Sequence, residues 1–230
     1  MQLWGPSKTL AGFALAAGLC AAPAQAVVVY VEDNTTPDSI AGVADFFTTG
    51  ALMSGMAVTA SFSNGLTETI AWVTTGAGAG SATGIGWSLA ESGDTFVSAW
   101  TFTFLDDGLG MLESLSLDGT PGLTLFDRIE PSFGTEGSAQ GSDFIFSGPP
   151  EFDVTVTYAR PIGIGGDLPV GDLFHVMTID FGEFGPRTGS FSFLQDTDND
   201  AARQVPEPAL LGLFGLALAA FGANRLRRAA

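Results

Sequence analysis

Apolar and polar residues alternate along much of the chain. Apolar side chains stand at every second position in 56–62 and again in 152–158, with polar residues between most of them. The aromatic residues of 96–104 also fall at even positions. A period of two is typical of strands that bury one face, and amphipathic helical patterns are hard to find in the same region. The pattern therefore predicts an all-β domain in which phenylalanine supplies much of the core.

Turn signals separate the alternating segments. Asn64-Gly65 is a strong hairpin signal, and we expect a three-residue loop, 64–66, because that length places the apolar residues of both strands on one face. The turn residues of 118–122 predict a second hairpin between strands on either side. Residues 75–86 are rich in Gly, Ala and Ser and predict a flexible connection. About seven to ten strands at this spacing favour an antiparallel β-sandwich or a jelly roll.

The chain begins with a segment of another kind. Lys8 precedes a short apolar run, which ends at the Ala-Gln-Ala of 24–26, the small-residue spacing of a signal-peptidase site. Residues 1–26 are therefore expected to be a secretory signal peptide, with Val27 as the mature start. Cys20, the single cysteine of the chain, lies inside this peptide. The mature protein is accordingly expected to contain neither a disulfide nor a cysteine nucleophile.

The C-terminal end combines an uncharged run with a basic cluster. Residues 209–223 carry no charge and would span about 22 Å as a helix, which is less than the about 30 Å of a bilayer core. Arg225, Arg227 and Arg228 follow, and basic residues of this kind stay in the cytoplasm. We therefore expect 209–228 to be a transmembrane helix with a basic stop, short enough to suit an anchor that is later cut.

Val205, Pro206, Glu207 and Pro208 precede this run. The prolines favour an extended chain and remove two backbone donors, so a processing enzyme would meet an unpaired segment. The motif, the apolar run and the arginine cluster, in that order over 205–228, resemble the PEP-CTERM sorting signal. The resemblance implies recognition by an exosortase, a membrane-embedded cysteine transpeptidase-like enzyme, and a cell-surface or extracellular-matrix destination in a Gram-negative-type bacterium. A plain, permanent membrane anchor is the alternative interpretation.

The chain thus divides into four regions. We expect the signal peptide at 1–26, a β-sandwich domain at 27–195, an acidic and proline-containing linker with the sorting motif at 196–208, and the transmembrane helix with its basic stop at 209–228. The expected fold class is all-β, an antiparallel β-sandwich of jelly-roll type that is exported between these two targeting segments.

Alternate aspartates mark the one candidate metal site. Asp196, Asp198 and Asp200 offer oxygen ligands at every second position, like the start of a calcium loop. The glycine that an EF-hand requires at the sixth position is replaced by Ala201, which excludes an EF-hand but leaves a looser calcium loop open. The other interpretation is a solvated acidic linker between the domain and the sorting tail.

Few residues suggest catalysis. His175 is the only histidine and shares a face with apolar residues, which favours a core or edge position, and one histidine cannot supply a multi-histidine zinc site. No Gly-x-Ser-x-Gly nucleophile elbow is present. Trp72, Trp87 and Trp100 are expected to pack in the core, with a sugar-binding platform as the alternative.

The net charge of the chain limits the classes of molecule that it can bind. The region 27–204 holds 24 of the 25 acidic residues against four arginines, a net charge of −20. Nucleic-acid binding is excluded, because it requires phosphate neutralisation, and anionic membranes are disfavoured.

The sequence therefore predicts a non-enzymatic exported protein with a structural or binding role in the extracellular matrix or biofilm. An exosortase is the expected processing partner, the membrane is a transient one through 209–223, and exopolysaccharide is a candidate ligand. One alternative is a secreted glycan-active hydrolase that uses paired carboxylates. The other is a permanently tail-anchored periplasmic protein.

Overall fold

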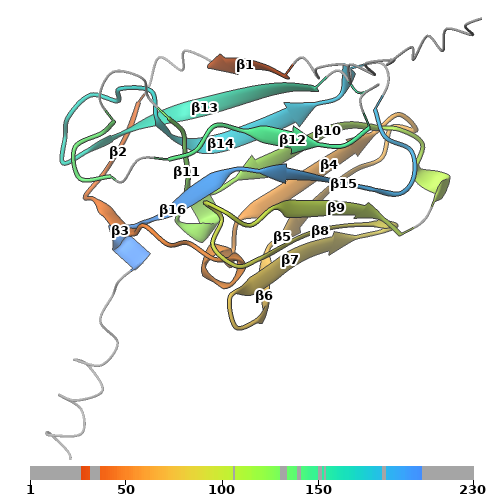
Figure 1. Cartoon of the computed structure of the whole chain (residues 1–230), viewed down its shortest axis with the longest axis horizontal. Coiled ribbons are helices and arrows are strands. Elements are labelled where there is room, and N and C mark those ends of the chain that lie inside the picture. Colours follow the sequence, from red (N-terminus) through yellow and green to blue (C-terminus); the bar gives the residue numbers. More distant parts are fainter. Residues whose placement is uncertain are drawn as a thin grey trace, which may run out of the picture.

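The computed structural model describes residues 27–31, 37–105, 107–129, 134–138, 141–149, 152, 154–182 and 185–203. This part of the chain contains sixteen strands and short 3₁₀ turns but no α-helix (Figure 1). The strands form two sheets that pack face to face, which confirms the prediction of an all-β, mainly antiparallel fold. The predicted signal peptide, sorting motif and transmembrane helix lie outside the described residues.

The larger sheet contains ten strands. Its main path follows the order β3 (Val43–Asp45), β16 (Asp196–Asp200), β11 (Thr124–Asp127), β14 (Leu173–Asp180), β10 (Leu112–Asp118), β4 (Ala57–Phe62) and β5 (Thr67–Ala71). Beside this path, β13 (Val154–Ile164) pairs antiparallel with β14 and in parallel with β1 (Val27–Val31) and β2 (Asp38–Ile40).

The smaller sheet contains six strands, all antiparallel to their neighbours. Their order is β12 (Ile145–Ser147), β15 (Ser190–Leu194), β9 (Trp100–Phe104), β8 (Trp87–Ser92), β7 (Ala79–Gly84) and β6 (Val73–Gly76). Short 3₁₀ turns η1 (Gly50–Met53), η2 (Asp107–Leu109), η3 (Thr120–Gly122) and η5 (Ala201–Arg203) lie between strands or follow the last one. The chain crosses between the sheets several times, and at two of these crossings a single residue, Trp72 or Gln195, separates the two strands.

Aromatic rings fill the space between the sheets. The inner faces of β8, β9 and β15 stack three rings in line: Trp87 lies 5.8 Å from Phe102, which lies 5.1 Å from Phe191. All three tryptophans predicted for the core are at most 1% exposed. Each indole N–H has an acceptor, as in Trp72, whose Nε1 donates to the carbonyl of Gly50 at 2.7 Å. The alternative of a tryptophan sugar platform is therefore wrong.

Two predicted connections have a different structure. Residues 75–86 are not a flexible loop, because they include β7, which pairs with both β6 and β8. Gly80 of β7 lies against the Trp72 indole, where a Cβ would overlap Nε1, so the small residue serves packing. The turn at 118–122 does not make a hairpin either. β10 and β11 are separated by β14, which pairs with both of them.

The predicted loop of the first hairpin has the correct length but lies one residue too far along the chain. Ser61 pairs with Thr67, and inside this pair the Phe62 N–H donates to the Leu66 carbonyl at 2.9 Å. The three-residue loop is therefore 63–65 and begins one residue earlier than predicted. The apolar residues of β4 still face the core, as expected from the alternation.

The largest correction concerns residues 196–200. They are not a linker but the strand β16, which pairs with β11 on one side and with β3 on the other. After β16, η5 is held by a bond from the Ala201 N–H to the Gly42 carbonyl, 2.8 Å long. The folded domain therefore extends at least to residue 203 instead of ending at 195.

Candidate functional site

The aspartates of β16 lie inside the larger sheet. Asp196, Asp198 and Asp200 are 4%, 1% and 8% exposed, respectively. Polar neighbours make this burial possible, because buried polar groups need hydrogen-bond partners. Thr95 donates from Oγ1 to Asp196 Oδ1 at 3.2 Å and accepts from the Thr197 N–H at 3.1 Å. The strand is thus held by side chains from the β8–β9 connection as well as by its pairing partners.

Two further buried aspartates lie next to β16. Asp127 of β11 pairs directly with Asp196, and Asp172 precedes β14. Asp172 is well bonded: Oδ2 accepts from the Thr135 N–H at 2.5 Å, and Oδ1 accepts from the Thr135 hydroxyl at 2.6 Å. Asp127 Oδ2 accepts from Ser138 Oγ at 3.3 Å, whereas Oδ1 has no partner among the described residues. We call Asp127, Asp172, Asp196 and Asp198 the acidic cluster.

Burial and mutual repulsion raise pKa values in the acidic cluster. The pKa of Asp127 is raised to about 9, chiefly by burial and then by the nearby charges of Asp198, Asp196 and Asp172. The pKa of Asp196 is raised by burial to about 7, although the hydrogen bond from Thr95 partly opposes the shift. Asp127 therefore carries a proton at neutral pH. A shared proton is one way for close carboxyl groups to avoid facing each other as two charges.

Arg128, the residue after Asp127, packs on an aromatic ring. Its guanidinium lies 4.8 Å from the centre of the Tyr158 ring. Tyr158 in turn donates its hydroxyl hydrogen to Gln195 Oε1. The same Gln195 donates from Nε2 to the Asp127 carbonyl at 2.8 Å and closes this side of the acidic cluster.

The geometry of β16 differs from that of a calcium loop. Residues two apart on a strand are separated by about 6.6 Å, whereas ligands of one Ca²⁺ ion all lie about 2.3–2.6 Å from it. Within the described part of the chain, no group of three or more His, Cys, Asp or Glu residues is placed to hold a metal ion. Asp196, Asp198 and Asp200 therefore do not form the expected loop, and calcium binding stays a prediction.

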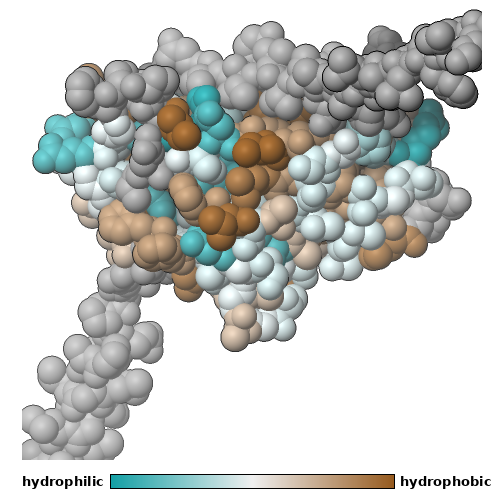
Figure 2. All heavy atoms as spheres, in the orientation of Figure 1, coloured by the Kyte–Doolittle hydropathy of each residue, from teal (hydrophilic) through white to brown (hydrophobic). Residues whose placement is uncertain are grey.

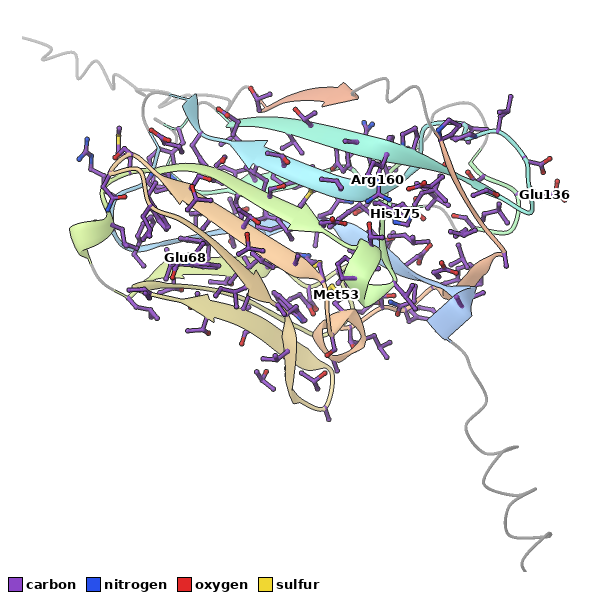
Figure 3. The ribbon with its side chains drawn as sticks, turned by 180° about the vertical axis from the view of Figure 1, so that it is seen from behind. Met53, Glu68, Glu136, Arg160 and His175 are labelled. Atoms are coloured by element: carbon purple, nitrogen blue, oxygen red, sulfur yellow. The ribbon has the colours of Figure 1, made fainter. Side chains whose placement is uncertain are left out.

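A second polar cluster surrounds the only histidine. His175 is 6% exposed, and its Nε2 lies 3.5 Å from Asp38 Oδ2, which also accepts from Arg160 at 2.6 Å (Figure 3). Arg160 donates a further bond to Thr120 Oγ1 at 2.8 Å. Burial lowers the pKa of His175, with Arg160 adding to the effect, so the ring is neutral at pH 7. The cluster ties β2 to β13 and β14, which is the core or edge role expected for His175.

Glu91 is a further buried acid that the sequence did not single out. It is 2% exposed, and burial raises its pKa to about 7. Its backbone borders a shallow hollow of about 230 Å³ on the smaller sheet, otherwise lined by small residues such as Ala79, Ala90 and Ala99. Because β8 alternates, with Ser88, Ala90 and Ser92 more exposed and Glu91 buried, the carboxyl group points away from this hollow.

Hydroxyl groups cover the middle of the outer side of the smaller sheet, between the exposed Val73 of β6 and Ile145 of β12 at its two edges. Thr83 pairs with Ser88, Ser88 with Thr103, and Thr103 with Ser190, so one hydroxyl row crosses four strands. Together with a second, parallel row, it forms what we call the hydroxyl face: Ser81, Thr83, Ser88, Thr101, Thr103, Ser190 and Ser192. Glu91 is the only charged residue in the six strands, and it is buried. Pale spheres over β8, β9 and β15 mark this neutral surface in Figure 2.

The sequence signals for these features are weak. The hydroxyl face corresponds to the polar half of each alternating strand, but its extent depends on a strand order that the sequence does not reveal. Asp127 and Asp172 flank apolar residues of the strands β11 and β14, which is the one available hint that they are buried.

Comparison with known proteins identifies one segment. Residues 204–228 match the family model of the PEP-CTERM protein-sorting motif, which confirms the resemblance drawn from 205–228. The chain therefore carries a signal for export, membrane transit and processing by an exosortase-type enzyme. No curated protein and no solved structure matches the chain. In the described residues, no helix has the length and apolar character needed to cross a membrane.

Proposed function

We propose that this protein is an exported β-sandwich protein that exosortase-type sorting delivers to the cell surface or extracellular matrix, where it has a structural or binding role. One observation carries the proposal: the sorting motif begins at residue 204, directly after η5, the last element of the fold. A folded domain and a sorting segment that follow each other without a gap are suited to delivery of the domain as a unit.

Cell fractionation with mass spectrometry of the mature C-terminus tests this proposal. The wild-type chain is expected at the surface or in the medium, without residues 209–230. Glu207→Ala, inside the motif, is expected to keep the full tail and stay with the membrane, whereas Ala202→Ser, just before it, is expected to behave as wild type. A surface protein with an intact end at Ala230 would instead favour the permanently anchored alternative.

The hydroxyl face supports a binding role toward a neutral polysaccharide. Serine and threonine hydroxyls both donate and accept, and they match the hydroxyl groups of sugars. Because the domain carries −20 charges and this face carries none, it is the surface that a neutral, hydroxylated polymer can approach at the smallest cost in charge desolvation.

Co-sedimentation with insoluble cellulose tests the binding role. Thr101→Asp places a charge in the hydroxyl face and is expected to weaken binding several-fold. Thr69→Asp is the matched control, since Thr69 is an exposed strand threonine of the larger sheet. Equal binding of both variants and the wild type would contradict the role of this face. Release of soluble sugar during the assay would instead favour the glycan-active hydrolase.

A further inference from the structure

Four large apolar side chains are exposed together at one end of the domain. Phe46 and Phe47 follow β3 and are 45% and 75% exposed, and Phe96 and Val97 of the β8–β9 connection are 45% and 70% exposed. We call these four residues the aromatic patch. The two connections that carry it are joined, because the Thr95 N–H donates to the Thr48 carbonyl at 2.9 Å and Thr49 bridges to Asp94. Exposed apolar groups gathered in this way mark interaction sites.

The aromatic patch lies beside the last strand of the fold. Asp45, directly before Phe46, pairs with Asn199 of β16. On the other side of the patch, Thr95 bonds to Asp196 and Thr197. Brown and tan spheres gather in Figure 2 at the end of the molecule where Figure 1 places β3 and η5. Both halves of the patch are therefore fixed next to the point where the fold ends and the sorting segment begins.

The reach of the chain brings this end of the domain close to a membrane. Five residues, 204–208, lie between Arg203, the end of η5, and the start of the apolar run at 209. The six Cα–Cα steps from 203 to 209 extend over at most about 20–22 Å. Asn199 is only four residues before Arg203, so Phe46 lies within a similar distance of the same point. When the apolar run is inserted in a bilayer, the aromatic patch is thus an apolar surface held within reach of it.

The net charge of the domain favours a zwitterionic over an anionic lipid surface. With a net charge of −20, the mature region is repelled by anionic headgroups. Zwitterionic headgroups impose no such repulsion, and aromatic side chains are favourable at the bilayer interface. The nearest carboxylate of the β8–β9 connection, Asp94, accepts from the Phe96 N–H at 3.1 Å, so part of its hydrogen-bonding capacity is already satisfied by its own loop.

We propose that the aromatic patch docks into the interface of a zwitterionic bilayer while the sorting tail is inserted, and so orients the domain for processing. The inference rests on the proposed function, because the inserted tail is what brings the patch to the membrane. Docking holds the segment 204–208 close to the membrane surface, where a membrane-embedded processing enzyme acts. After processing, the patch leaves the bilayer with the released domain.

Fluorophore labels at single cysteines test the docking in the full chain, with Cys20→Ser removing the native thiol. Phe47→Cys reports on the patch. Ile85→Cys is the matched control: it is 71% exposed, and its turn joins β7 to β8 at the end opposite the β8–β9 connection. Leu211→Cys reports on insertion of the tail. Each protein is reconstituted into phosphatidylcholine vesicles whose acyl chains carry nitroxide quenchers.

The expected result is strong quenching at positions 211 and 47, with quenching at 47 at least about twofold above that at 85, since interfacial side chains enter about 5–10 Å into the headgroup–acyl boundary. Equal quenching at 47 and 85 beside a quenched label at 211 overturns the docking but leaves sorting intact. An unquenched label at 211 overturns both. A blue-shifted label at 47 without vesicles assigns the patch to a second copy of the chain and overturns the lipid proposal.

Discussion

Asp127 and Asp196 stand directly opposite each other in the antiparallel pairing of β11 with β16, and both are buried. Adjacent strands place such partners about 4.5–5.5 Å apart at Cα. Two carboxyl groups so close in the interior cannot both be charged without strong repulsion. Burial is the first cause of the raised pKa values, about 9 for Asp127 and about 7 for Asp196, and the charges of Asp198, Asp196 and Asp172 add to the shift of Asp127.

These shifts predict that the protein loses stability as the pH rises. Asp127, Asp196 and Glu91 have folded-state pKa values of about 9, 7 and 7, above the about 4 of an unfolded chain. The folded state therefore binds more protons between these values, and each group costs about 1.4 kcal/mol of unfolding free energy per pH unit there. Urea unfolding followed from about pH 5 to about pH 9 is expected to show the highest stability at the acid end.

The variants Asp127→Asn and Asp196→Asn serve as controls for this dependence. Each removes one titrating carboxyl group and is expected to flatten the pH profile over the window of that group. Asp180→Asn, in an exposed position of β14, is expected to leave the profile unchanged. A wild-type profile that rises toward pH 9 would contradict the assigned charge states.

Binding of calcium by Asp196, Asp198 and Asp200, which stays a prediction, would stabilise the folded state. At about pH 8, addition of calcium would then raise the unfolding free energy, by about 2.7 kcal/mol at one hundred times the dissociation constant. Thermal unfolding with and without calcium measures the effect. Isothermal titration compares the wild type with an Asp196→Asn/Asp198→Asn double variant, and identical heats from the two proteins would remove calcium as a ligand.

A single methyl group at Gly80 is expected to destabilise the core. A Cβ there would overlap the Trp72 indole and the Gly50 carbonyl, which are hydrogen-bonded to each other. Overpacking of this kind costs about 1–3 kcal/mol, and the loss of the indole hydrogen bond adds to it. Gly76→Ala is the control, because the nearest atom to its Cβ would be 3.9 Å away. Similar midpoints of thermal unfolding for the two variants would show that the close contact of Gly80 with Trp72 does not affect stability.

Truncated chains test where the folded domain ends. A chain that ends at residue 195 lacks β16 and leaves β3 and β11 without their common partner. We expect it not to fold, because it loses a buried strand with the pairing on both of its sides, and a whole domain is stabilised by only about 5–15 kcal/mol. A chain that ends at residue 203 is expected to fold as the full protein does. Circular dichroism and cooperative unfolding distinguish the two outcomes, and a folded chain ending at 195 would restore the linker interpretation.

The sequence predicted those parts of the fold that depend on local alternation. The buried face of β13 and the aromatic interior of β9 follow from apolar residues at every second position, since one sheet face meets the core. The hairpin loop at 63–65 was predicted in length but not in register. The loop begins one residue earlier than predicted, which moves the pairing by two residues, as in Val58 with Ile70, and so keeps the same side chains on each face.

The prediction failed where distant partners decide the environment. Residues 196–200 have the composition of a solvated linker, yet Thr95, far away in the sequence, supplies hydrogen bonds that make their burial possible. Residues 79–84 are small because the ring of Trp72 lies against Gly80, not because the segment is flexible. The exposed position of Phe96 was missed as well, since its even number suggested the face of Trp100.

The position of β16 sets the order of events during biosynthesis. This strand ends only 30 residues before the C-terminus, yet it completes the sheet between β3 and β11. Thr48 and Asn199, which bond across 151 positions, cannot meet until residue 199 has been made. Because the strand between β3 and β11 is also the last strand of the fold, the larger sheet stays open until β16 has been synthesised.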